Sequence, residues 1–229
     1  MMCMSLDRYR SKRNFAKTAE PQGAATKRRR ERKNDPSEVV FVIQKHAASR
    51  LHYDFRLEIE GVLKSWAVPK GVPLVKGDKN LAVQVEDHPA EYGGFEGVIP
   101  AGNYGAGTVM LWDAGICQIL EGKPAEALRQ GKLVFRLEGR KLRGQWTLVR
   151  MRPREDRDEN GWLLIKTGDD ARPISARAED RSIQSGRTMK QIAAQQDRLW
   201  ESNRKASPGR GGKSGLRTAH RSNRRQVSA

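Results

Sequence analysis

Cysteine is scarce in this sequence, and long apolar runs are absent. Only Cys3 and Cys117 occur among 229 residues, too few for a disulfide framework or for a zinc site built from four cysteine ligands. Residues 1–13 contain no apolar segment of signal-peptide length. Nothing in the chain approaches the roughly 20 consecutive apolar residues of a membrane-spanning helix. We therefore expect a protein of the reducing cytoplasm that does not contact a membrane.

Several familiar catalytic motifs are also missing. The chain has no Lys-x-Asp-Gly sequence of the kind used in nucleotidyl transfer and no Gly-x-Ser-x-Gly elbow. Residues 93–107 are rich in glycine, but they lack the strand, loop and helix context of a nucleotide-binding loop. We expect this segment to form a structural loop.

Positive charge is abundant but unevenly distributed. The chain has 44 Lys and Arg residues against 27 Asp and Glu, which gives a net charge of +17. Residues 1–35 carry 11 cations and 4 anions, residues 171–229 carry 14 and 4, and residues 36–170 carry 19 of each. A neutral body with two basic arms favours a polyanionic partner such as nucleic acid, and hence a nucleoid-associated location.

These changes in composition predict four segments. Residues 1–36 form a basic arm whose first part is expected to pack on the folded domain, which spans residues 37–168. Residues 169–201 are predicted to be a linker with a short helix at 187–201. Residues 202–229, composed mainly of Ser, Gly and Arg, are predicted to form a disordered basic tail.

The folded domain has the sequence pattern of a β protein. One short helix is expected at residues 124–130, ended by Gly131. Turns are expected at Asp113-Ala114-Gly115 and at two Glu-Gly pairs. Many short strands with few helices favour a mainly β fold, a small closed or nearly closed β-barrel of about eight strands. The expected strands are residues 39–44, 51–59, 66–68, 81–86, 108–112, 132–137, 144–150 and 162–166.

The expected strand at residues 51–59 carries the most informative polar pattern. Successive side chains of a strand alternate between its faces, so His52, Asp54 and Arg56 share the face opposite the apolar residues. Imidazole and carboxylate groups ligate divalent ions, and a guanidinium donates paired hydrogen bonds to phosphate. His46, six residues before His52, can complete a His-His-Asp set. The alternative is a solvent-exposed face with a surface ion pair.

A second polar cluster follows the expected strand at residues 81–86. Glu86 and His88 end that strand, and Tyr92 follows four residues later. Of the four histidines in the chain, three fall between positions 46 and 88. Ordinary strand-end polarity would explain any one of these residues, but together they indicate groups that converge on a pocket.

Six motifs then occur in a characteristic order between residues 41 and 109. They are FVIQKH (41–46), RLHYDFRLE (50–58), LKSWAVPKG (63–71), VEDHP (85–89), FEGVIP (95–100) and YGAGTV (104–109). This set closely resembles the 3′-phosphoesterase domain of bacterial DNA ligase D. The resemblance implies a small β-barrel and a manganese-dependent enzyme of non-homologous end joining. Such an enzyme removes a 3′-terminal ribonucleoside and then hydrolyses the remaining 3′-phosphate to a 3′-hydroxyl.

The resemblance also implies roles for individual residues. His46, His52 and Asp54 would be the metal ligands, and the mixed nitrogen and oxygen set suits manganese but would also accept zinc or cobalt. The residues implied to act on the phosphate are Arg56, His88 and Tyr92. The residues implied to support them are Gln44, Lys70, Glu86, Arg13 and Glu20.

Two positions depart from the pattern of the family. Asn14 stands where the family commonly has Asp, and Asn80 stands where it commonly has Arg. Because Asn80 removes a cation from the expected phosphate site, we expect the monoesterase step to be the first to suffer. The alternative to an active enzyme is therefore a catalytically weakened accessory module that binds DNA ends. A phosphatase indifferent to the 2′-hydroxyl is a further alternative.

The expected partners follow from the same resemblance. The substrates would be DNA or RNA–DNA primer 3′ ends, and Ku-like, polymerase and ligase repair proteins would be the protein partners. In ligase D the domain is fused to polymerase and ligase domains, whereas this sequence contains neither. We expect a free-standing, monomeric end-processing enzyme.

Overall fold

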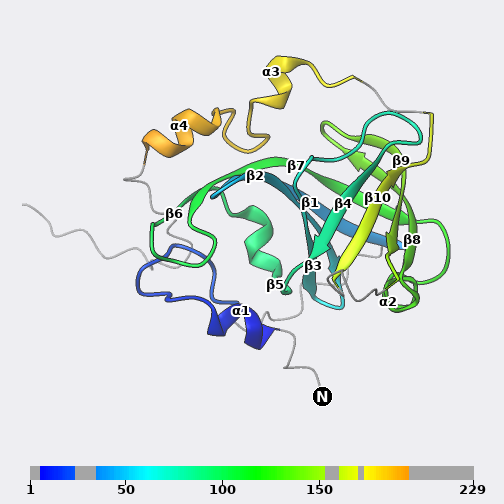
Figure 1. Cartoon of the computed structure of the whole chain (residues 1–229), viewed down its shortest axis with the longest axis horizontal. Helices are drawn as coiled ribbons and strands as arrows, with labels where there is room; N and C mark the ends of the chain where they lie inside the picture. The colour runs from blue at the N-terminus through cyan, green and yellow to red at the C-terminus, as the bar shows by residue number, and fades with distance from the viewer. Residues whose placement is uncertain (1–5, 24–34, 153–159, 170–172, 196–229) are drawn as a thin grey trace, which may run out of the picture.

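Eight antiparallel strands form a closed barrel in the computed structural model, which describes residues 6–23, 35–152, 160–169 and 173–195 (Figure 1). Each strand pairs with the next, and β1 pairs with β7 to close the ring. In order around the barrel the strands are β1 (Glu38–Ala47), β2 (Leu51–Ile59), β3 (Val62–Val68), β4 (Lys79–Gln84), β10 (Gly161–Lys166), β9 (Arg143–Arg150), β8 (Lys132–Gly139) and β7 (Gly107–Ile119). The predicted mainly β fold with a closed barrel is confirmed.

Two short strands and five short helices complete the described fold. The strand β5 (His88–Pro89) pairs with β3, and β6 (Gly97–Ile99) pairs with β7. The helices are α1 (Asp7–Ser11), the 3-10 helix η2 (Ala90–Gly94), α2 (Pro124–Gln130), α3 (Ala176–Glu179) and α4 (Met189–Ala194). Helix α2 has the predicted bounds and ends at Gly131 in the left-handed conformation. No helix within the described ranges is long and apolar enough to cross a membrane.

Two expectations fall partly or wholly outside the described residues. The basic tail at residues 202–229 lies outside them, as does the second half of the helix expected at 187–201. The first half of that helix is α4, which begins after Thr188. A reciprocal pair of hydrogen bonds between Thr188 and Gln191 caps it.

The turn expected at Asp113-Ala114-Gly115 is wrong, because these residues lie inside the long strand β7. A register shift opposite Ile43 and Gln44 replaces the turn, so that Asp113 pairs with Ile43 and Leu111 with Gln44. The carboxylate of Asp113 accepts hydrogen bonds from the backbone N–H groups of residues 140, 141 and 142. The turn-forming side chain thus caps the neighbouring β8–β9 connection instead of making a turn of its own.

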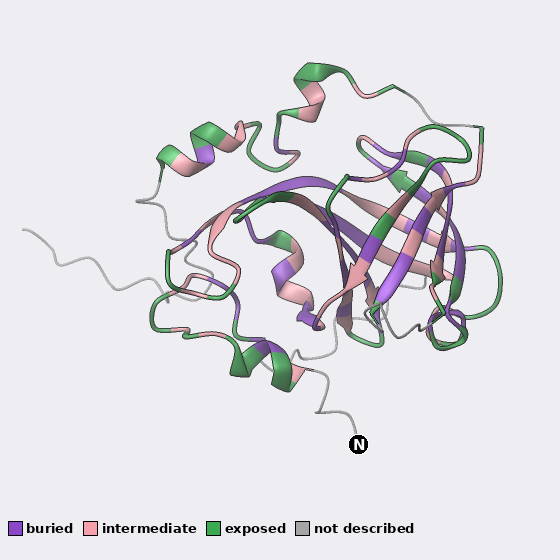
Figure 2. Cartoon of the chain, in the orientation of Figure 1, coloured by how far each residue is buried: buried purple, intermediate pink, exposed green. Residues whose placement is uncertain are grey.

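Two apolar clusters lie on opposite faces of the barrel wall. The larger cluster fills the interior and includes the stacked rings of Phe55 and Phe135 and the side chains of Trp66 and Trp146. The smaller cluster joins Tyr9 of α1 to side chains of η2, β3, β6 and β7. Buried residues therefore appear both along the strands and on the segments outside them (Figure 2).

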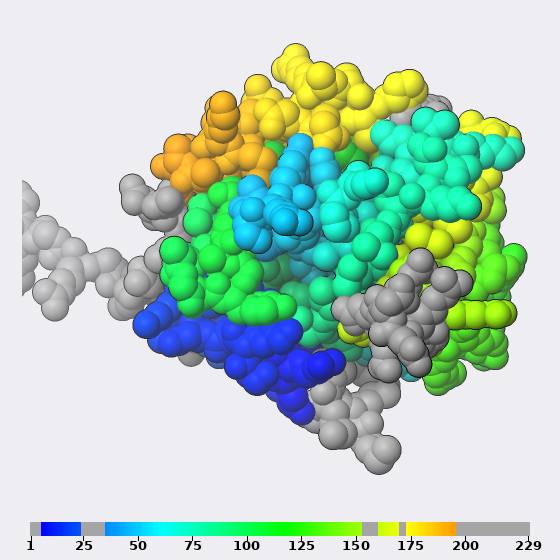
Figure 3. Space-filling view, in the orientation of Figure 1, coloured from blue at the N-terminus to red at the C-terminus, as the bar shows by residue number. Residues whose placement is uncertain are grey.

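The smaller cluster holds the N-terminal segment against the barrel. Tyr9 is fully buried, and its hydroxyl donates to the carbonyl of Pro21. Residues 6–23 lie along the segment near residue 100, where the blue and green surfaces meet in Figure 3. A fully buried tyrosine side chain contributes about 2 kcal/mol of burial free energy. The docked segment therefore forms one wall of the region described next.

Candidate active site

The pairing of β1 with β2 sets the frame of the site. These strands are antiparallel, and their register places His46 opposite His52, Gln44 opposite Asp54 and Val42 opposite Arg56. Because paired residues point to the same face of a sheet, these side chains gather outside the barrel. Phe55 points to the opposite face and is buried in the interior cluster. The alternation that the sequence predicted for this strand is therefore present in the structure.

These side chains line a cavity of about 240 Å³ between the barrel, η2 and the N-terminal segment. We call it the metal pocket. Its wall contains eight of the eleven site residues expected from the sequence, namely Arg13, His46, His52, Asp54, Arg56, Glu86, His88 and Tyr92. Gln44 and Glu20 lie behind this wall and contact it. Lys70 is exposed and does not line the pocket.

Three side chains in the pocket have the geometry of a metal site. The ligand atoms of His46, His52 and Asp54 all lie within 4.8 Å of one another. Nδ1 of His46 is 3.6 Å from Oδ2 of Asp54, and Nε2 of His52 is 3.6 Å from Oδ1. Two nitrogen donors and one carboxylate at these separations fit a divalent ion such as manganese, zinc or cobalt.

Backbone carbonyls orient both imidazoles toward the same point. Nε2 of His46 donates to the carbonyl of Gly105 at 2.9 Å, and Nδ1 of His52 donates to the carbonyl of Arg50 at 3.0 Å. A neutral imidazole that donates from one nitrogen keeps a lone pair on the other. The free lone pairs are then on Nδ1 of His46 and Nε2 of His52, the two atoms that face Asp54.

The carboxylate of Asp54 is kept ionised although it is buried. Burial raises the pKa of this group, and the guanidinium of Arg56 makes the largest of the contributions that together lower it by more. The net effect is a pKa below the usual value. Asp54 is therefore available as an anionic ligand across the physiological pH range.

Arg56 is a buried cation at the centre of the pocket. Its side chain is 2% exposed, and Nη2 donates to Asp54 at 3.1 Å while Nη1 donates to Ser65 at 2.7 Å. Its guanidinium also lies 4.9 Å from the ring centroid of Tyr92. The position beside the candidate ligands suits a group that stabilises charge on a metal-bound phosphate.

Gln44 fixes the orientation of Arg56. The amide nitrogen of Gln44 donates to the carbonyls of Tyr92 and Phe95, at 3.0 and 2.9 Å. Its amide oxygen is thereby turned to Nε of Arg56, from which it accepts a hydrogen bond at 2.8 Å. Gln44 is fully buried, so removing either set of bonds would leave polar groups unpaired, at a cost of about 1–3 kcal/mol each.

His88 is buried between two arginines and is neutral near pH 7. Burial and the positive charges of Arg56 and Arg13 place its pKa well below 6.5. Nδ1 lies 2.9 Å from the carbonyl of Glu86, and Nε2 lies 3.2 Å from Nη2 of Arg13. A neutral ring that donates from Nδ1 to this carbonyl and accepts from Arg13 at Nε2 satisfies these two contacts. Nη1 of Arg56 is also 2.9 Å from Nδ1, and in this tautomer it donates to Ser65 instead.

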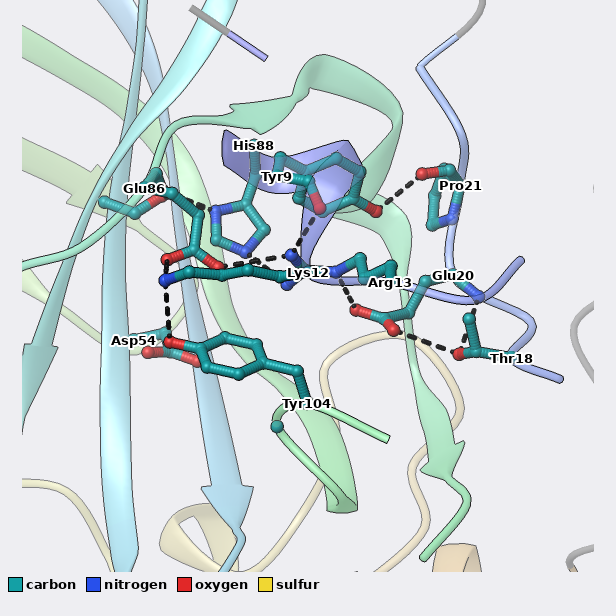
Figure 4. A network of polar contacts seen from close by, with 12 residues as sticks. Tyr9, Lys12, Arg13, Thr18, Glu20, Pro21, Asp54, Glu86, His88 and Tyr104 are labelled. Carbon is teal, nitrogen blue, oxygen red and sulfur yellow. Dashed lines mark hydrogen bonds and ion pairs between the residues drawn. The ribbon is translucent and has the colours of Figure 1, made fainter. Parts of the chain in front are cut away.

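The N-terminal segment contributes charged groups to the pocket. Arg13 forms ion pairs with Glu20 at 2.7 Å and with Glu86 at 3.2 Å, and all three side chains are almost fully buried. Lys12 forms a further ion pair with Glu86 at 3.0 Å and donates to the hydroxyl of Tyr104. Figure 4 shows this network passing from Glu20 through Arg13 and Glu86 to Lys12 and Tyr104.

Three groups at the pocket were not expected from the sequence. Lys12 lies outside the six motifs, whereas Tyr104 and Gly105 belong to the YGAGTV motif but to a segment that was expected to be purely structural. Lys12 and Tyr104 are 92 positions apart, so their contact depends on how the N-terminal segment docks. The signal that could have found Gly105 is the need of a ligand imidazole for a hydrogen-bond acceptor.

The two departures, Asn14 and Asn80, do not line the metal pocket. The side chain of Asn14 is exposed and accepts a hydrogen bond from the backbone N–H of Ala16. The side chain of Asn80 donates to the carbonyl of Gly71 at 2.7 Å. Neither asparagine side chain therefore contributes to the lining of this pocket. Reduced monoesterase activity caused by Asn80 stays a prediction.

Comparison with known proteins was made against family models and curated sequences. Residues 44–150 match the model described as the DNA ligase D 3′-phosphoesterase domain. Over 164 residues the chain is 50% identical to the multifunctional non-homologous end joining protein LigD of Pseudomonas aeruginosa, a match that covers 72% of this chain and 19% of that protein. It is 44% identical over 145 residues to the corresponding DNA repair protein of Mycobacterium tuberculosis, covering 63% and 18%.

A third relative, the LigD protein of Mycolicibacterium smegmatis, is 39% identical over 180 residues, or 76% of this chain and 22% of that protein. The chain thus spans about a fifth of the length of the curated relatives that it matches. The matched residues include the candidate ligands on β1 and β2 and the polar cluster around His88. The chain belongs to the DNA ligase D 3′-phosphoesterase domain family.

Proposed function

We propose that this protein is a metal-dependent phosphoesterase that processes DNA 3′ ends during non-homologous end joining. It would remove a 3′-terminal ribonucleoside and then hydrolyse the 3′-phosphate to a 3′-hydroxyl. The observation that carries the proposal is the His46, His52 and Asp54 set, with ligand atoms within 4.8 Å, beside the buried guanidinium of Arg56. Membership of the phosphoesterase family supports it.

A divalent ion held by these three side chains, with manganese as our choice, would supply Lewis acidity toward a phosphate oxygen. The chain itself supplies the remaining functions. Arg56, held in place by Gln44, donates hydrogen bonds to the phosphoryl oxygens as negative charge grows on them. Nε and Nη1 of Arg56 are held by Gln44 and Ser65, and Nη2 uses one of its two N–H groups on Asp54, so Nη2 is the nitrogen that faces the phosphate.

His88 is the candidate for proton transfer. Its neutral ring has one nitrogen fixed on the carbonyl of Glu86, while the other contacts Arg13. An anionic phosphate that draws Arg13 toward itself would free Nε2 to accept a proton from water or to return one to the leaving oxygen. Tyr92 packs on the His88 ring at a centroid distance of 4.7 Å and keeps its orientation. The roles of Glu86 and Glu20 are to hold Arg13.

The set of groups in the pocket lining favours an active enzyme over a weakened end-binding module. Neither the Asn14 nor the Asn80 side chain belongs to the pocket lining, and every proposed ligand and phosphate contact is present in it. We further propose Ku-like, polymerase and ligase repair proteins as partners, since the relatives are named for non-homologous end joining.

The test is a manganese-dependent assay on a primer that ends in a single ribonucleotide. We expect the wild-type chain to release the nucleoside and then phosphate, and His52→Ala and Asp54→Ala to lose both steps and manganese binding by calorimetry. Asp169→Ala is the matched control, because Asp169 is 77% exposed and its carboxylate pairs with Lys76, away from the pocket. Full turnover by both ligand variants would refute the proposal. An all-deoxy primer tests the need for the 2′-hydroxyl.

A further inference from the structure

A second cavity adjoins the metal pocket and shares part of its wall. Its volume is about 510 Å³, and Val85, Glu86 and Tyr104 line both cavities. We call it the side groove. The charged side chains on its wall are Arg8, Lys12, Lys64, Glu86 and Asp87.

Tyr104 lies where the two cavities meet. Its side chain is 47% exposed, and it belongs to the loop of residues 100–106 that connects β6 to β7. Nζ of Lys12 lies 4.4 Å from the ring centroid, and the guanidinium of Arg13 lies 5.7 Å from it. A half-exposed aromatic ring beside cations is the arrangement on which the bases of single-stranded nucleic acids stack.

The loop fixes Tyr104 relative to the candidate metal site. The next residue, Gly105, accepts the hydrogen bond from Nε2 of His46 at 2.9 Å. A base stacked on Tyr104 therefore lies next to the residue whose carbonyl orients His46. Tyr104 and Asp54 both line the metal pocket, and Figure 4 shows Lys12 between Tyr104 and Glu86.

The side groove has a net positive wall. Three cations face two carboxylates, which leaves one excess positive charge. Lys12 pairs with Glu86 and Lys64 pairs with Asp87 at 2.6 Å, but Arg8 forms no ion pair with any residue that the structure describes. The Lys12 side chain is 37% exposed, so its ammonium group can be reached from solvent although Glu86 is buried. A phosphate group of a nucleic-acid strand can therefore compete for the N–H groups of Arg8, Lys12 and Lys64.

We propose that the side groove binds the nucleotide whose 3′-oxygen carries the scissile phosphate, with Tyr104 stacked on its base. This inference rests on the proposed function, in which both steps act on the same phosphate. The substrate of the second step keeps only the nucleotide on the 5′ side of that phosphate. A site for this nucleotide therefore serves both steps, whereas a site for the leaving ribonucleoside would serve only the first.

Binding measured without turnover tests the stacking. The probe is a single-stranded DNA that ends in a 3′-phosphate and carries 2-aminopurine as its last base, titrated with the full chain in the absence of metal. We expect fluorescence quenching with wild type and with Tyr104→Phe, which keeps the ring. Tyr104→Ala should abolish the quenching and bind about tenfold more weakly, as expected for one base stack. Because Tyr104 is half exposed, we expect Tyr104→Ala to fold normally. Its melting temperature, measured separately, reports any folding defect.

An abasic version of the probe identifies the nucleotide. Without a base to stack, wild type and Tyr104→Ala should bind it equally. Equal binding of the base-containing probe by the two proteins would overturn the inference, as would quenching only when 2-aminopurine is placed on a 3′-terminal ribonucleoside. Quenching with no hydrolysis in the manganese assay would instead count against the proposed function alone.

The phosphate contact in the groove has its own readout. Arg8→Gln should reduce the slope of the logarithm of the binding constant against the logarithm of salt concentration by about 0.7, the value for one single-strand phosphate. Lys132→Gln is the matched control, since Lys132 lies on β8 and lines neither cavity. An unchanged slope in Arg8→Gln would overturn the proposed contact between Arg8 and a phosphate of the bound DNA strand.

Discussion

At the scale of single residues, the pocket stabilises charge by pairing every buried ion. Arg56 and Arg13 face Asp54, Glu86 and Glu20 within hydrogen-bonding distance, and Lys12 adds the third positive charge. Taking a charge out of water is costly unless partners compensate it. The three cations and three carboxylates of this network balance, so a metal ion would give the pocket the positive charge that holds a phosphate.

His88 is the one member of this network that should make stability depend on pH near neutrality. Its pKa is well below 6.5 in the folded chain, because of burial and two adjacent guanidinium groups, and about 6.5 in the unfolded chain. Between these values the unfolded chain binds more protons. The stabilisation is therefore complete above about pH 6.5 and is lost as the pH falls toward and through the folded-state pKa.

We accordingly expect the free energy of unfolding of the wild-type chain to fall between pH 7.5 and pH 5.5. His88→Asn, which removes the titrating ring, should be less stable than wild type at pH 7.5 but should show a smaller fall. Urea denaturation at the two pH values measures both differences. Equal falls in the two proteins would show that another group is responsible.

Residue chemistry was the part of the site most open to prediction. The alternation along β2 placed His52, Asp54 and Arg56 together, because the period of a strand is two whatever surrounds it. The sequence did not indicate that Arg56 would be buried, since burial depends on η2 and on the docked N-terminal segment. Contacts between distant segments, such as that of Lys12 with Tyr104, carry no local signal at all.

At the scale of elements, the junction between the β6–β7 loop and the first residue of β7 must approach β1 closely. Gly107 has φ +148°, and a Cβ there would lie 2.3 Å from the carbonyl oxygen of Ala47 and 2.8 Å from Cα of Ala48. No larger residue fits without moving the loop. Because the same loop carries the carbonyl of Gly105, which orients His46, this glycine links the packing of the loop to the metal site.

Gly107→Ala should therefore weaken metal binding although residue 107 is not a ligand. We expect the affinity for manganese to fall about 10- to 100-fold, the usual effect of removing the partner of a ligand imidazole. Titration followed by electron paramagnetic resonance measures it. Gly94→Ala is the control, since a Cβ at Gly94 meets nothing within 4 Å. Wild-type affinity in Gly107→Ala would mean that His46 does not need this loop.

The elements themselves were predictable where hydrophobic alternation was regular, and less so where tertiary contacts extend a strand. Strand β7 continues through Asp113-Ala114-Gly115 because two neighbours, β1 and β8, pair with it. A Cβ at Gly115 would lie 2.1 Å from the carbonyl oxygen of Glu138, so this glycine permits close strand approach instead of a turn. Composition alone does not separate these two uses of glycine.

At the scale of the whole molecule, the excess positive charge and the candidate active site lie mainly in different parts of the sequence. Residues 36–170 carry 19 cations and 19 anions, whereas the flanking residues hold the entire excess of +17. Attraction to a polyanion extends over about one Debye length and is not directed to one site. We therefore propose that the flanking segments supply general affinity for nucleic acid, and that the metal pocket and the side groove select the 3′ end.

Residues 202–229 provide the test of this division, because they contain eight Lys and Arg residues and no acidic residue. Deleting them should weaken binding to duplex DNA and lower the salt slope by about 0.9 for each phosphate that the shortened chain no longer neutralises. A variant of full length with these eight residues changed to glutamine should match the deletion, since charge and not length sets the slope. Fluorescence anisotropy without metal measures both. An unchanged slope in either variant would place the electrostatic contacts elsewhere in the chain, with residues 1–35 as the next segment to neutralise.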